Sequence, residues 1–129
     1  MQSDRQKVLI VDDDPSQLEI YALLVEQAGY ASVPALVKFA GAEFPQVDDI
    51  GLIILDYRLT SSKTSSELAL EMRSLYPAAP IILLSDVWNL PTEIAPYVAD
   101  FVRKGEPAKL LGTLSRLLPV HCETKLETD

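Results

Sequence analysis

Charged and hydroxyl side chains stand at the ends of four apolar segments of this sequence. They are Asp12 and Asp13 after the first segment, Asp56 after the second, Ser85 after the third and Lys104 after the fourth. Clustered carboxylates repel one another unless a cation lies among them, and oxygen ligands of this kind suit Mg²⁺. A carboxylate near a cation and a lysine can attack a phosphoryl group and form an acyl phosphate. The chemistry requires a fold that brings these five positions together.

The apolar segments predict β-strands that are covered on both faces. Their apolar residues are continuous rather than alternating, which is typical of a parallel sheet. The predicted strands are residues 8–11, 52–55, 81–84 and 100–103, with a weaker fifth at 31–34.

Helix signals occupy the segments between these strands. Asp14 is a plausible N-cap with Pro15 at the first helical position, and Thr64 and Glu67 have capping-box spacing. The predicted helices span about 15–28, 36–44, 64–75 and 107–118.

Two details of the helical segments carry further expectations. Leu68, Met72 and Leu75 lie at helical spacing and predict the buried stripe of the third helix. Pro91 and Pro96 interrupt the connection between the fourth and fifth strands, so any helix there should be short or irregular.

Alternating strands and helices predict a single doubly wound α/β domain with right-handed crossovers. All strands of such a sheet point the same way, and ligands bind where the strands end, near the topological switch point. The polar residues that end the apolar segments should therefore converge on one edge of the sheet.

Composition limits the partners of this domain. The 129 residues are 48% hydrophobic, enough for one core, and carry a net charge of −8. An acidic chain is a poor match for nucleic acid or an anionic membrane, so we expect proteins or cations as partners. The N-terminus lacks a signal-peptide pattern, and Cys122 is expected to be a free thiol in a tail. These features predict a cytoplasmic protein.

The motifs "VDDDP", "LDYRL" and "FVRKGEP", with Ser85 between the last two, resemble the receiver domain of two-component response regulators. The resemblance covers about residues 7–118 and leaves 1–6 and 119–129 as tails. It implies a flavodoxin-like fold with a five-stranded parallel sheet in the order 2-1-3-4-5.

The resemblance also assigns roles to the strand-end residues. It implies that Asp56 is the phosphoacceptor and that Asp12, Asp13, Asp56 and the backbone carbonyl of Arg58 hold Mg²⁺. Lys104 would neutralise the transferring oxygens.

Two further positions match the switch of the family. Ser85 would bond a phosphoryl oxygen that was absent before the reaction, and Phe101 would move into the space that the hydroxyl vacates. An aromatic residue that simply packs in the core remains an equal alternative for Phe101.

By resemblance, the expected partners are a sensor histidine kinase or a histidine phosphotransfer protein, a downstream protein target and a second copy in a homodimer. The chain would not be an enzyme beyond self-phosphorylation from small donors and self-dephosphorylation. One alternative is a pseudo-receiver, an interaction module that phosphorylation does not regulate. A phosphatase of the haloacid-dehalogenase type is disfavoured, because Arg58 stands where a second aspartate is needed.

Two residues depart from the family pattern. Gly105 follows Lys104 where the family usually has proline, which favours a trans bond. Asp86 follows Ser85 where a small residue is usual. Its carboxylate would either obstruct an incoming phosphate by charge repulsion or cap the following segment.

Overall fold

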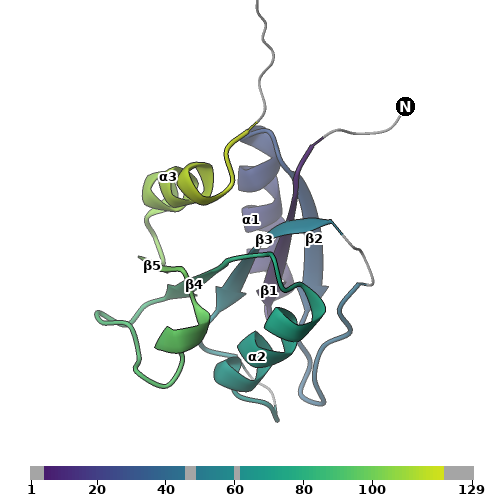
Figure 1. Cartoon of the computed structure of the whole chain (residues 1–129), viewed down its shortest axis with the longest axis vertical. Coiled ribbons are helices and arrows are strands. Elements are labelled where there is room, and N and C mark those ends of the chain that lie inside the picture. The colour runs from purple at the N-terminus through teal and green to yellow at the C-terminus, as the bar shows by residue number, and fades with distance from the viewer. Residues whose placement is uncertain (1–4, 46–48, 60–61, 121–129) are drawn as a thin grey trace, which may run out of the picture.

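The computed structural model describes residues 5–45, 49–59 and 62–120 of the chain. Five strands and three helices follow one another along these residues, and no described helix separates the second strand from the third (Figure 1). The strands are β1 (Lys7–Asp12), β2 (Ala31–Leu36), β3 (Ile50–Asp56), β4 (Ile81–Ser85) and β5 (Asp100–Arg103). The helices are α1 (Pro15–Gln27), α2 (Ser65–Leu75) and α3 (Pro107–Leu117), with a 3-10 turn, η1 (Ala95–Tyr97), before β5.

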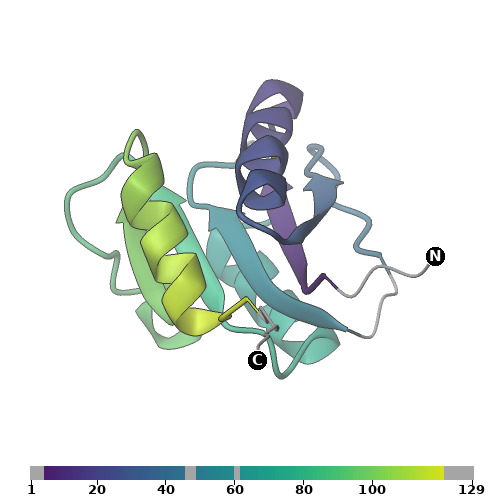
Figure 2. The same ribbon diagram turned by 90° about the horizontal axis from the view of Figure 1, so that it is seen from above.

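The strands form one parallel sheet in the order β2-β1-β3-β4-β5, as predicted. Helices α1 and α3 cover one face, whereas α2 and η1 cover the other (Figures 1 and 2). The interiors of β1, β3 and β4 are almost completely buried, because apolar side chains on both faces of these strands meet a helical layer.

The predicted N-terminal signals of the helices are confirmed. The Asp14 carboxylate accepts a hydrogen bond from the Ser16 N–H at the start of α1. Thr64 and Glu67 form a reciprocal capping box at the start of α2. The cap of α1 lies two residues after Asp12, whereas the cap of α2 lies eight residues after Asp56.

The helix predicted at 36–44 was wrong. Strand β2 continues to Leu36, and an antiparallel bridge joins Lys38 to Gly41 in the loop that follows. Gly41 has a φ of 125°, which side-chain-bearing residues rarely adopt and which a right-handed helix does not contain. A local turn therefore replaces the predicted helix.

The stripe predicted for α2 was right for Leu68 and Met72 and wrong for Leu75. The first two are fully buried, but Leu75 is 51% exposed at the last turn of the helix. Ala69 packs in the core beside Leu68 and Met72 instead. The expectation of an irregular fourth helix is confirmed, since η1 spans three residues.

Among the described residues, no helix combines the length and apolar character that crossing a bilayer requires. Of the predicted tails, residues 1–4 and 121–129, with Cys122, lie outside the described residues.

Candidate functional site

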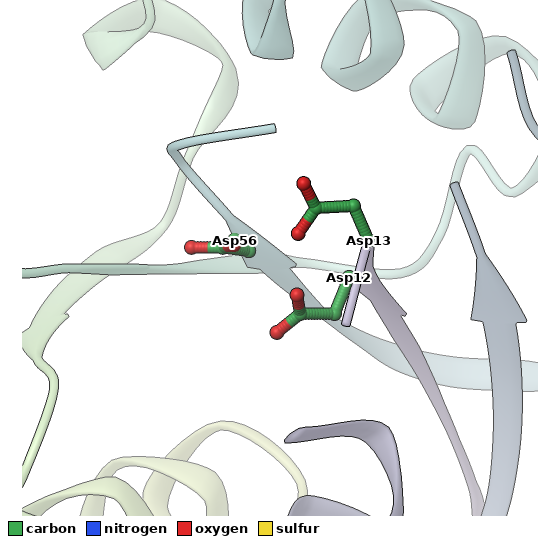
Figure 3. A group of neighbouring side chains, drawn as sticks. All are labelled: Asp12, Asp13 and Asp56. Carbon is green, nitrogen blue, oxygen red and sulfur yellow. The ribbon is translucent and has the colours of Figure 1, made fainter. Parts of the chain in front are cut away.

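Three carboxylates meet at the carboxyl edge of the sheet. Asp12 ends β1 and Asp56 ends the adjacent strand β3, while Asp13 follows Asp12 in the loop before α1. One carboxylate oxygen from each of the three lies within 4.8 Å of the others. Figure 3 shows the side chains directed toward a common space. The convergence predicted from the strand ends is confirmed for the three aspartates.

Burial makes this cluster electrostatically unfavourable. Asp12 is 2% exposed and Asp56 is 3% exposed. Burial, and then the charge of Asp56, raise the pKa of Asp12 from its ordinary 3.8 to about 7. Burial also raises the pKa of Asp56, although Lys104 offsets part of the rise. Without a cation, burial therefore favours the protonated form of Asp12.

Lys104 supplies a positive charge next to the predicted phosphoacceptor. Its Nζ lies 2.9 Å from Asp56 Oδ1. Burial works against the charged ammonium, but Asp56 and Asp12 outweigh it, and the pKa of Lys104 is raised. The lysine remains an ammonium at neutral pH, and its Nζ lies next to the carboxylate at which it was predicted to neutralise the transferring oxygens.

The segment after Lys104 explains the missing proline. Gly105 has a φ of 86°, a value that proline is unable to adopt because its ring holds φ near −65°. Every peptide bond among the described residues is trans. The chain therefore turns after Lys104 by means of a left-handed glycine.

Ser85 is completely buried at the end of β4, the strand next to β3. Its Oγ accepts a hydrogen bond from the Val87 N–H at 3.1 Å. Phe101 lies on β5 in register with Leu83 and is partly buried against the core on the α2 face. Its predicted movement is a property of two states and stays a prediction.

The structure supports neither alternative weighed for Asp86. The Arg58 Nε donates a hydrogen bond to Asp86 Oδ1 at 2.7 Å, so the Asp86 charge is paired with a guanidinium. The capping position is taken by the Ser85 hydroxyl, through its bond with Val87. Arg58 lines the same cleft as the three carboxylates, and its carbonyl stays a predicted ligand.

A cleft of about 640 Å³ connects the carboxylates to the surface. Its polar end contains the three aspartates and Lys104, and its apolar walls come from α1 and from the start of α3. The apolar residues include Ile20, Leu24, Pro107 and Leu110. A partner that reaches Asp56 through this cleft would lie along α1.

The residues present fit a divalent cation. Asp56 Oδ1 is buried and accepts no aligned hydrogen bond from the described residues, so its contact with Lys104 is an ion pair with acceptor capacity to spare. Three hard oxygen donors with two raised pKa values form the environment that a small dication would stabilise. Asp12, Asp13 and Asp56 are the side chains that would hold it.

Solved structures of receiver domains share this architecture. CheY4, a chemotaxis protein of Vibrio cholerae, superposes with a TM-score of 0.66 at 24% identity, over 88% of this chain and 99% of that chain. A CheY-like response regulator receiver domain from Methylobacillus flagellatus gives a TM-score of 0.69 at 17% identity, over the same two shares. The chain folds as a response-regulator receiver domain.

A sequence comparison finds a similar regulatory protein. The chain is 28% identical over 88 residues, 68% of its length, to the transcriptional regulatory protein GlrR of Escherichia coli strain K12. The chain spans about a fifth of the length of this curated relative. No family model matches the chain.

Two contacts beside the site were missed by the sequence analysis. One is the pair formed by Arg58 and Asp86. The other stacks the Arg103 guanidinium on Trp88, with Cζ 3.6 Å from the ring centroid. Neither pair has a characteristic sequence spacing, since each joins two loops or strand ends that only the folded sheet brings together.

Proposed function

We propose that this receiver domain accepts a phosphoryl group on Asp56 and so acts in two-component signal transduction. The observation that supports this most is the environment of Asp56. Its buried carboxylate lies between the Lys104 ammonium and two further aspartates, at the end of a cleft that opens to the surface. A charged carboxylate buried to this extent does not contribute to stability, because burial raises its free energy when no cation is bound.

The proposed reaction is an in-line transfer. An oxygen of Asp56 attacks the phosphorus, the bond between phosphorus and the donor atom breaks, and the donor keeps the electron pair of that bond. The product is an acyl phosphate. Lys104 stabilises the negative charge on the transferring oxygens, and Mg²⁺ bound by Asp12, Asp13 and Asp56 would supply further charge neutralisation.

The donor we propose is a phosphohistidine of a histidine kinase or of a phosphotransfer protein. Ile20 is 51% exposed beside the cleft, which gives such a protein apolar surface on α1 next to the acidic site. Output would pass to a downstream protein target, and a homodimer is a further possible partner state. A cytoplasmic location follows from this role, as does the absence of catalysis beyond self-phosphorylation and self-dephosphorylation.

A pseudo-receiver is the second candidate, and the connections of the sheet favour it. Residues 37–45 contain no helix, and η1 is the one helical turn described between β4 and β5. These connections differ from the regular helices expected at both places in a doubly wound domain. An interaction module could keep the sheet and the acidic cluster while using these surfaces for binding.

The experiment that separates the two candidates is phosphorylation of the full chain. The protein is incubated with Mg²⁺ and acetyl phosphate or phosphoramidate, and its intact mass is measured, with Asp56→Asn as the control. We expect one phosphoryl group on the wild-type chain and none on Asp56→Asn. An unmodified wild-type chain with small donors and with a panel of phosphorylated histidine kinases would reject the phosphoacceptor role.

A further inference from the structure

Trp88 is the single tryptophan of the chain and one of its most exposed apolar side chains, at 76%. It lies between β4 and β5, three residues after Ser85. The Arg103 guanidinium stacks on its ring, with Cζ 3.6 Å from the centroid. A cation over an indole face is attractive even at the surface. The stack therefore holds one face of the ring against Arg103 of β5, while most of the Trp88 side chain stays exposed.

Arg103 is joined directly to the phosphoacceptor site. It pairs in register with Ser85 across β4 and β5, and the next residue is Lys104, the partner of Asp56. The Lys104 N–H donates to the Ser85 carbonyl oxygen at 2.8 Å. The Arg103 Nε is buried and has no hydrogen-bond acceptor among the described residues. The indole is thus a principal contact of this guanidinium.

Ser85 also controls the segment that carries Trp88. Its Oγ accepts the Val87 N–H, which fixes the turn just before the indole. Ser85 is fully buried, so its hydroxyl has few positions to choose from. If the Ser85 side chain rotates to another rotamer to donate to a phosphoryl oxygen on Asp56, its Oγ moves away from the Val87 N–H, which then loses the acceptor that fixes this turn.

We propose that the Trp88–Arg103 stack is a surface latch that is closed in the unphosphorylated domain and released on phosphorylation of Asp56. The inference rests on the proposed function for its trigger. The structural coupling between the Ser85 hydroxyl and the stack, which is the mechanical half of the inference, can be tested without phosphorylation. Release frees the indole and the guanidinium together at the β4–β5 edge, which gives the two states different surfaces.

The mechanical half is tested without a phosphoryl donor. The indole N–H gives one resonance in a ¹⁵N-correlated NMR spectrum, because the chain has a single tryptophan. Arg103→Gln defines the position of this resonance in the open latch. We expect Ser85→Ala to move the resonance most of the way to that position, and Ser85→Cys, whose sulfur is a weaker acceptor, to move it part of the way.

Two variants serve as controls for this test. Ser74→Ala alters an exposed serine on α2 and should leave the resonance in place, while Ser85→Thr keeps a hydroxyl and should stay near wild type. If Ser85→Ala does not give a folded spectrum, Ser85→Cys decides the question. An indole resonance that stays at the wild-type position in folded Ser85→Ala and Ser85→Cys would overturn the coupling.

The trigger is tested on wild-type protein with Mg²⁺ and acetyl phosphate, with intact mass measured on the same sample. A phosphorylated chain whose indole resonance moves toward the Arg103→Gln position supports the latch. A phosphorylated chain with an unmoved resonance overturns the latch and leaves the proposed function intact. A chain that no donor phosphorylates rejects the proposed function and the trigger together, while the Ser85 variants still decide the coupling.

Discussion

Replacing Asp12 by asparagine should stabilise the metal-free protein at pH 8. Asp12 is 2% exposed, and burial together with the charge of Asp56 raises its pKa from 3.8 to about 7. A carboxyl whose pKa is higher in the folded state favours folding when it is protonated. That stability is fully present below pH 3.8 and is lost as the pH rises through about 7.

The size of the effect follows from this shift. Each pKa unit corresponds to about 1.4 kcal/mol, so the rise of about 3 units costs the charged form about 4 kcal/mol at pH 8. An asparagine carries no charge, but it leaves amide groups buried with imperfect partners, at a cost of about 1–3 kcal/mol. We therefore expect the free energy of unfolding to rise by about 1–3 kcal/mol at pH 8.

Urea denaturation at pH 8 and pH 5, without metal, measures this difference. Asp12 is mostly protonated at pH 5, so the advantage of Asp12→Asn should shrink there. Mg²⁺ should stabilise the wild-type protein more than the variant, because the charged Asp12 carboxylate can bind the cation and the asparagine amide binds it less strongly. Asp14→Asn is the matched control, since it removes one exposed negative charge next to the cluster and asparagine also caps α1.

An Asp12→Asn protein that is no more stable than wild type at pH 8, or whose advantage grows toward pH 5, would refute this reasoning.

Three other variants test the site and the fold. Lys104→Gln should slow phosphorylation of Asp56 by about 10-fold or more, because the variant lacks the ammonium 2.9 Å from Asp56. The rate is measured by intact mass at timed intervals, and an unchanged rate would exclude Lys104 from the transfer. Met72→Ala should lower the free energy of unfolding, measured by urea denaturation, by about 2–5 kcal/mol, because Met72 is fully buried. Leu75→Ala changes an exposed position of the same helix and should lower it by about 1 kcal/mol or less. Similar losses in the two variants would contradict the difference in burial. Gly105→Ala should cost about 1–2 kcal/mol by the same measurement, because its φ of 86° strains any residue with a Cβ, and a neutral effect would contradict that conformation.

Much of the fold is encoded locally. Continuous apolar runs before Asp12, Asp56 and Ser85 identify buried parallel strands, and Asp14 and Thr64 identify the starts of α1 and α2. These signals depend on a few neighbouring residues and on the hydrogen bonds that they satisfy, so they survive in the sequence. The convergence of the aspartates followed from the same signals, because parallel strands end on one edge.

Tertiary packing decided the remaining elements. The segment from Leu36 to Phe44 contains apolar residues that could suit a short helix, but pairing of β2 with β1 extends the strand to Leu36 and the turn at Gly41 ends any helical course. Leu75 has the spacing of a buried residue, yet it lies beyond the surface that the sheet offers to α2. In both cases local propensity is weak, and contacts with distant strands outweigh it.

The side-chain partners beside the site also required the folded chain. Asp86 carries a charge that the sequence places next to Ser85, but its pairing with Arg58 depends on how the ends of β3 and β4 lie together. The stack of Trp88 on Arg103 likewise joins residues that are adjacent only across the β4–β5 edge. Sequence determined which groups reach the carboxyl edge of the sheet, since strand direction alone sets that. Their pairing, burial and pKa values were decided by tertiary structure, because these depend on distances and solvent exclusion between segments far apart in the chain.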